Sequence, residues 1–108
     1  MECRWVYMTA ETREEAEKIG KALVERRLAA CVNIIGNMTS MYWWEGEVQT
    51  GSETVLIAKT VAAHVPALIE AVKAEHSYSC PCVIALPILD GNPDFLDWIR
   101  SETSPREN

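Results

Sequence analysis

Apolar and β-branched residues gather in two long runs that flank a short polar turn, and this pattern predicts a long β-hairpin. Residues 31–35 and 38–44 form the first arm, and Asn33 is the polar break within residues 31–35. Val48 and residues 54–59 form the second arm. Glu45-Gly46 lies between the arms, and glycine accommodates the positive φ that a tight hairpin turn requires. Both arms are longer than the usual strand of roughly 5–6 residues.

Three consecutive aromatic residues, Tyr42, Trp43 and Trp44, stand at the tip of this hairpin. Successive side chains of a strand point to opposite faces, so one core cannot bury all three. Aromatic residues are enriched in the cores of protein interfaces, which favours an oligomer formed through the hairpin. The alternative is a tip whose rings are simply half-exposed, as single apolar residues often are. We favour the first and predict that residues 42–44 lie in a subunit interface.

A helical pattern follows a first predicted strand at residues 4–9. Thr12 and Glu15 have the spacing of a capping box, in which the threonine caps the helix and the glutamate reaches back. Apolar residues then recur three or four positions apart, at Ala16, Ile19 and Leu23 among others, as in a helix with one buried face. The helix is predicted to end near Arg26-Arg27, where cations suit the carbonyl end.

The second half of the chain contains another helix, another strand and a final helix. A helix is predicted over residues 62–75, with Pro66 in its first turn, where proline is tolerated. Residues 81–89 are typical of a strand, and Pro87 places its end at a sheet edge or a bulge. Asn92-Pro93 opens the final helix, with asparagine as the cap and proline at the first helical position.

The predicted order is therefore strand, helix, strand, strand, helix, strand and an extra helix. Two strand–helix–strand units joined by a hairpin give an α+β fold, the ferredoxin-like split βαβ sandwich. The helices cover one face of the sheet. The other face, which includes the long hairpin, is the one that an oligomer would cover.

Composition and charge limit the partners of the protein. The chain has 108 residues, which we interpret as a single domain over residues 1–108. Its net charge of −6 and pI of about 4.9 disfavour nucleic acids and anionic membranes, which need a basic footprint. No apolar run has transmembrane length, and residues 1–4 lack the pattern of a signal peptide. We expect a cytoplasmic protein with no nucleic-acid or membrane partner.

Several short motifs are spread over almost the whole chain. They are LAACVNI at residues 28–34, SMYWWEG at 40–46, Lys59-Thr60, His76-Ser77-Tyr78 followed by Pro81, Leu86-Pro87, Gly91, and LDWI at 96–99. In this order and combination the motifs resemble the CutA family, the divalent-cation tolerance proteins. No single motif is specific, but the combination is.

The resemblance implies a ferredoxin-like subunit in a tight homotrimer built through the long hairpins, similar in architecture to PII signalling proteins. It also implies a cytoplasmic protein linked to tolerance of copper and other divalent metals. Some members carry a cysteine at the end of the first strand and a His-His pair before the tyrosine. The matching positions here are Met8 and Glu75-His76.

Four residues near the end of the second helix are the candidate metal ligands. His76 is a candidate for a soft metal or for proton transfer, and the alternative is an imidazole that interacts with helix-end carbonyls. Cys80 and Cys82 together suit Cu(I) or zinc, and the alternative is simple packing. Glu75 adds a carboxylate. Copper or another divalent metal is the expected ligand of this group.

A second hypothesis is a ligand cleft between subunits, which would make the protein a PII-like sensor of a small molecule. Trp44, Lys59 and Tyr78 would line the cleft, together with Glu47 and His76, and would suit a small anionic or polar ligand. The alternative for Lys59 is an ordinary surface ion pair.

We expect no enzymatic activity. Cys31 or Cys82 would need an activating base and a lowered pKa to act as a nucleophile. The sequence has no recognisable Cys-His spacing, Ser-His-Asp set or Gly-rich phosphate loop. A hyper-reactive cysteine would revive the enzyme hypothesis.

Overall fold

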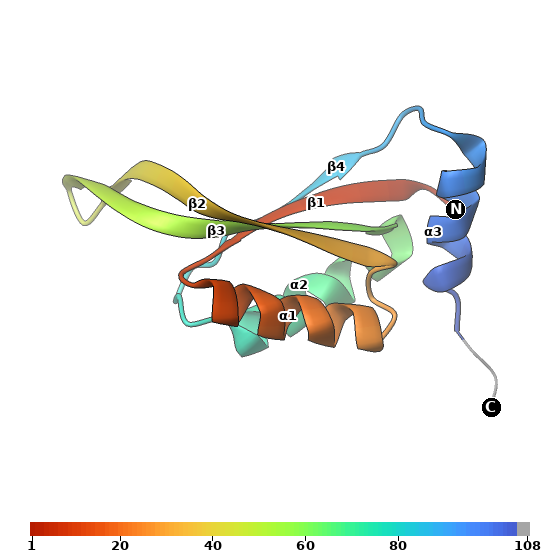
Figure 1. The fold of residues 1–108 in the computed structure, drawn as a ribbon, viewed down its shortest axis with the longest axis horizontal. Coiled ribbons are helices and arrows are strands. Elements are labelled where there is room, and N and C mark those ends of the chain that lie inside the picture. The colour runs from red at the N-terminus through yellow and green to blue at the C-terminus, as the bar shows by residue number, and fades with distance from the viewer. Residues whose placement is uncertain (106–108) are drawn as a thin grey trace.

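A four-stranded antiparallel sheet forms the centre of the protein, with two helices against one face and a third helix at one end (Figure 1). This computed structural model describes residues 1–105, so the last three residues of the predicted domain, 106–108, lie outside the described part. The strands are β1 (Cys3–Ala10), β2 (Cys31–Trp44), β3 (Glu47–Val61) and β4 (Val83–Pro87). The helices are α1 (Arg13–Glu25), α2 (Val65–Glu75) and α3 (Pro93–Glu102), and a short 3-10 turn (Ala62–His64) precedes α2.

The strand order is β2-β3-β1-β4, and each neighbouring pair is antiparallel. The two strand–helix–strand units therefore interleave, with β1 and β3 in the middle of the sheet. This arrangement confirms the predicted ferredoxin-like α+β fold with its extra C-terminal helix.

The main core lies between the sheet and the helices α1 and α2. Alternate residues of β1 point into it, because strand side chains alternate between faces: Val6, Met8 and Ala10 are all buried. They pack with apolar residues of both helices, among them Ile19, Leu23, Leu68 and Val72. A second cluster, which contains Cys3, Ala30, Val61 and Ile99, fixes α3 to the end of the sheet.

The predicted capping box opens α1, with one difference. The Glu15 amide donates to Thr12 Oγ1 at 3.1 Å, as expected for a capped helix. The Glu15 carboxylate accepts from the Glu11 amide at 3.1 Å and from the Ser77 amide at 2.9 Å. Glu15 therefore also ties the start of α1 to the loop that follows α2.

The long hairpin is confirmed and extends beyond the helices (Figure 1). Its two-residue turn has φ values of 50° at Glu45 and 80° at Gly46. Positive φ at both positions is the geometry of the type I′ turn, whose twist matches that of the strands. The arms pair from Cys31 and Lys59 to Trp44 and Glu47, which is more continuous than the sequence pattern predicted.

A β-bulge interrupts the pairing of β2 with β3. Ile35 pairs with Val55, and the next pair is Met38 with Glu53, so β2 has two residues where β3 has one. Asn37 adopts a φ of 60°, which asparagine tolerates better than most residues. The inserted residue exchanges the faces of all later β2 side chains.

The predicted ends of the second half needed small corrections. The 3-10 turn occupies the first three residues of the predicted helix 62–75. Strand β4 is limited to Val83–Pro87, within the predicted 81–89, and it is an edge strand, as Pro87 suggested. Asn92 caps α3 as predicted, because its Oδ1 accepts from the Asp94 amide at 3.1 Å.

Candidate functional site

The sheet face opposite α1 and α2 carries apolar side chains at its surface. Ile35, Ile84 and Leu86 are all about half-exposed there, and the rings of Trp5 and Tyr7 stack beside them with centroids 6.3 Å apart. We call this surface the open face. Large exposed apolar patches mark interaction sites on soluble proteins.

A hollow of about 750 Å³ lies where the open face meets the base of the protruding hairpin. We call it the hairpin hollow. It is lined by Tyr7, Thr9, Met38, Thr39, Ser40, Met41, Tyr42, Trp44, Glu53, Tyr78, Ser79, Cys80 and Cys82. Its walls come from β1, β2, β3 and the segment between α2 and β4.

The bulge determines which hairpin side chains reach this hollow. Val32 and Ile34 pack against the helix-side core. Without the inserted residue, Tyr42 and Trp44 would share that side, because even-numbered residues would stay on one face. After the bulge, Met38 lies on the open face, where its Sδ accepts from the Tyr7 hydroxyl at 3.4 Å.

Tyr78 is held firmly at the wall of the hairpin hollow. Its hydroxyl donates to Glu53 Oε2 at 3.0 Å, and its ring lies 4.7 Å from the imidazole of His76. Burial and the hydrogen bond to the Glu53 carboxylate raise the pKa of Tyr78. Burial and the same carboxylate raise the pKa of Cys82. Both groups are therefore neutral near pH 7.

His76 connects three elements through its two ring nitrogens. Nδ1 accepts from the Tyr78 amide at 3.1 Å, and Nε2 lies 2.7 Å from the Thr9 carbonyl oxygen. Because the carbonyl is an acceptor, Nε2 carries the proton that it donates. The side chain is 0% exposed, and Glu15 Oε1 lies 3.8 Å from Nδ1. Neither nitrogen has a free lone pair for a metal ion.

The four predicted metal ligands do not form one group. Glu75 pairs with Lys18 at 3.2 Å, and His76 is engaged as described above. Within residues 1–105, no three His, Cys, Asp or Glu side chains lie close enough to hold a metal ion. Cys80 and Cys82 do lie together, because both line the hairpin hollow. They are free thiols, as Cys3 and Cys31 are.

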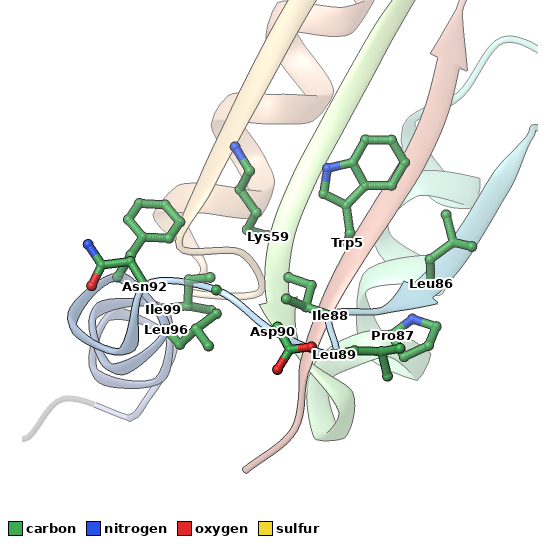
Figure 2. A pocket seen from close by; sticks show the side chains of 12 residues that line it. Trp5, Lys59, Leu86, Pro87, Ile88, Leu89, Asp90, Asn92, Leu96 and Ile99 are labelled. Carbon is green, nitrogen blue, oxygen red and sulfur yellow. The ribbon is translucent and has the colours of Figure 1, made fainter.

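The hairpin hollow contains part of the predicted ligand cleft, and Glu47 and His76 are not among its lining residues. Trp44 and Tyr78 line the hairpin hollow together, but Lys59 lies elsewhere. Lys59 pairs across strands with Trp5 and Cys31, and its Nζ donates to Asn33 Oδ1. It lines a second hollow, of about 710 Å³, between the sheet and α3 (Figure 2). Sequence spacing alone could not show that five residues of β3 separate Lys59 from Glu53, the β3 residue that lines the hairpin hollow.

The three tip aromatics divide between the two faces of the hairpin. Tyr42 and Trp44 line the hairpin hollow, whereas Trp43 does not and is 74% exposed. This division follows from the alternation of strand side chains. That all three lie in a subunit interface stays a prediction.

Sequence reasoning missed Tyr7, Met38 and Glu53 as residues of the site. Each comes from a different strand, and only the pairing of the strands brings them together. The dipeptide Gly36-Asn37 was the available signal, because glycine and asparagine inside a strand pattern indicate a bulge.

These features define a small α+β protein of ferredoxin-like topology with an elongated hairpin and a hollow at its base. The family described as CutA1 divalent ion tolerance protein matches residues 4–102. The chain belongs to this family, as its motifs indicated.

Individual relatives agree with this assignment. The divalent-cation tolerance protein CutA of Thermus thermophilus is 50% identical over 98 residues, which are 91% of this chain and 95% of that protein. The chloroplastic protein CutA 1 of rice is 46% identical, and the chain spans 55% of it.

Solved structures of CutA proteins have the same fold. The rice CutA1 structure has a TM-score of 0.94 and 42% identity, over 98% of this chain and 97% of that one. The periplasmic divalent cation tolerance protein CutA of Archaeoglobus fulgidus has a TM-score of 0.92 and 43% identity, over 94% and 99% of the two chains. Among residues 1–105 no helix is both long and apolar enough to cross a membrane.

Proposed function

We propose that this protein is a homotrimeric, cytoplasmic module of divalent-cation tolerance that binds metal ions, copper among them, and catalyses no reaction. Membership of the divalent ion tolerance family is the observation that carries the link to metals. The free thiols support a cytoplasmic location, because thiols persist in reducing compartments. The raised pKa of Cys82 argues against a nucleophilic cysteine at that position.

The open face supports the assembly. Its half-exposed apolar side chains, with the aromatic tip of the hairpin, form a surface that a second copy of the chain would cover. The number three comes from the resemblance to CutA trimers. Native mass spectrometry of the dilute protein should show a trimer, and Trp44→Ala should weaken it. A monomeric wild-type protein would contradict the proposed assembly. A Trp44→Ala variant that remains fully trimeric would show that the Trp44 side chain does not stabilise the subunit interface.

We assign metal binding to the thiols of Cys80 and Cys82. Thiolates and thioethers are the ligands that Cu(I) prefers, thiolates also bind zinc, and Met38 lines the same hollow with a thioether. His76 and Glu75 have structural partners instead. The exposed position of Cys80 leaves it free to approach an incoming ion.

Metal uptake can be measured on the intact assembly under reducing conditions. We expect Cu(I) or Zn²⁺ to bind in a fixed ratio to subunits and a Cys80→Ser/Cys82→Ser double variant to lose this binding. Cys31→Ser is the matched control, because Cys31 lies on β2 outside the hairpin hollow. Equal uptake by the double variant would refute the thiol assignment, and no uptake by the wild type would refute metal binding.

A second candidate function is that of a PII-like sensor of a small molecule. The hairpin hollow favours it, because about 750 Å³ is a usual size for a ligand pocket. The hollow opens on the face assigned to the trimer, so it would lie between subunits. A ligand that binds the trimer selectively should raise its thermal stability.

A further inference from the structure

Four aromatic rings and one carboxylate surround the hairpin hollow. Tyr7 lies on β1, Tyr78 lies in the segment between α2 and β4, Tyr42 and Trp44 belong to the protruding hairpin, and Glu53 lies on β3. The faces of aromatic rings carry negative electrostatic potential. A hollow lined by such rings and a carboxylate attracts positive charge.

No cationic side chain offsets this negative potential within the lining. Glu53 is the one charged residue among those that line the hollow in the described part of the chain. Lys59, which had suggested an anionic ligand, lines the other hollow (Figure 2). The lining residues of the hollow therefore favour a cation, whereas the sequence led us to expect a small anionic or polar ligand.

We propose that the hairpin hollow binds an organic ammonium cation, with Tyr42, Trp44 and Tyr78 around its alkyl groups and Glu53 as its counter-charge. A cation over an aromatic face is attracted by the ring quadrupole, most strongly over tryptophan. Alkylated ammonium groups suit such a hollow because they combine positive charge with an apolar surface. The inference rests on the second candidate function, ligand binding in this hollow, and requires no metal.

Two of the four aromatic rings, those of Tyr78 and Tyr7, are held in place before a ligand arrives. Tyr78 is fixed by its hydrogen bond to Glu53 at 3.0 Å and by its contact with the buried ring of His76. Tyr7 is fixed by its hydrogen bond to Met38 at 3.4 Å. Groups held in this way lose little conformational freedom on binding, which favours affinity.

A matched pair of compounds tests the charge preference directly. Choline and 3,3-dimethylbutan-1-ol have the same shape, but only choline carries a positive charge. Isothermal titration calorimetry of the intact protein, in buffer with EDTA to exclude metals, should show choline binding with one site per subunit. The neutral alcohol should bind at least about tenfold more weakly, the difference expected for a desolvated cation–π contact.

Two pairs of variants locate the binding. Glu53→Gln and Trp44→Leu should each weaken choline binding about tenfold. Glu14→Gln removes a charge from α1, on the other side of the sheet, and Trp43→Leu removes the neighbouring indole on the other hairpin face. These two controls should leave affinity unchanged. Native mass spectrometry of every variant shows whether the assembly is intact, and Glu53→Gln, which leaves the tip unchanged, is informative even if Trp44→Leu dissociates.

Three results would overturn the inference. Equal binding of choline and its neutral analogue would leave a ligand hollow but remove its preference for cations. Absence of choline binding by an intact wild-type assembly would remove the ammonium ligand, while the thermal-stability measurement would still decide the second candidate function. Equal losses of affinity in Glu53→Gln and Glu14→Gln would show that the overall charge of the protein, and not the hollow, causes the effect.

Discussion

Replacing His76 with alanine tests whether this histidine has a structural role or serves as a metal ligand. In the structure the imidazole donates to the Thr9 carbonyl and accepts from the Tyr78 amide, at 2.7 and 3.1 Å. Both partners are backbone groups, one at the end of β1 and one in the loop after α2. Without the ring, each loses its hydrogen-bond partner.

The cost of His76→Ala follows from these contacts. A buried polar group left without a partner costs about 1–3 kcal/mol. The lost ring contact with Tyr78 adds about 0.5–1.5 kcal/mol. Water can reach the Tyr78 amide more easily than the Thr9 carbonyl, because Tyr78 is partly exposed and Thr9 is buried. We therefore expect a loss of about 2–4 kcal/mol in the free energy of unfolding.

Urea denaturation at one fixed subunit concentration measures this change, since the stability of an oligomer depends on concentration. His64→Ala is the matched control, because within residues 1–105 the His64 ring has a single hydrogen-bond partner, the Thr103 carbonyl oxygen at 2.6 Å. We expect a loss of only about 1 kcal/mol for it. Metal uptake by folded His76→Ala should equal that of the wild type.

A different outcome would refute the reasoning. Near-normal stability of His76→Ala combined with weakened metal binding would show that the imidazole serves a metal and that its two backbone contacts are replaceable. Equal destabilisation by His64→Ala and His76→Ala would show that the second hydrogen bond contributes nothing measurable.

Three further predictions concern the fold. Leu23→Ala should lower the free energy of unfolding by about 2–5 kcal/mol in urea, because Leu23 is 1% exposed in the main core. Gly46→Ala should cost about 1 kcal/mol and lower the melting temperature, because φ at this turn residue is 80°. Burial raises the pKa of Glu15, but hydrogen bonds from Ser77 and Glu11 and the nearby His76 lower it below its ordinary 4.5. Its stabilisation should therefore be present above pH 4.5 and fade at lower pH, so the stability gap between wild type and Glu15→Gln, from urea titrations across pH, should shrink there.

Local sequence patterns were sufficient for the order and type of the elements. Thr12 and Asn92 are caps whose side chains bond the backbone two or three residues later, so their signal lies within one helical turn. The turn at Glu45-Gly46 is equally local, because its geometry depends on two φ values. The family could be recognised for a related reason, since its motifs are contiguous.

The composition of the site depended on long-range pairing. Residues on four different segments line the hairpin hollow, and their neighbours are set by strand register. The bulge at Gly36-Asn37 moved Tyr42 and Trp44 to the open face, and a shift of one residue in either strand would have moved them back. No local pattern records where such a shift falls relative to β1.

The sequence by itself determined that this chain forms a ferredoxin-like α+β fold with a long aromatic-tipped hairpin, because periodicity, caps and turn residues act over a few positions. Only the tertiary structure decided that Glu53, and not Lys59, lines the same hollow as Trp44 and Tyr78. It also decided that both ring nitrogens of His76 form hydrogen bonds with backbone groups. The physical reason is that charge and hydrogen-bond partners in a site depend on distances through space between strands far apart in the chain.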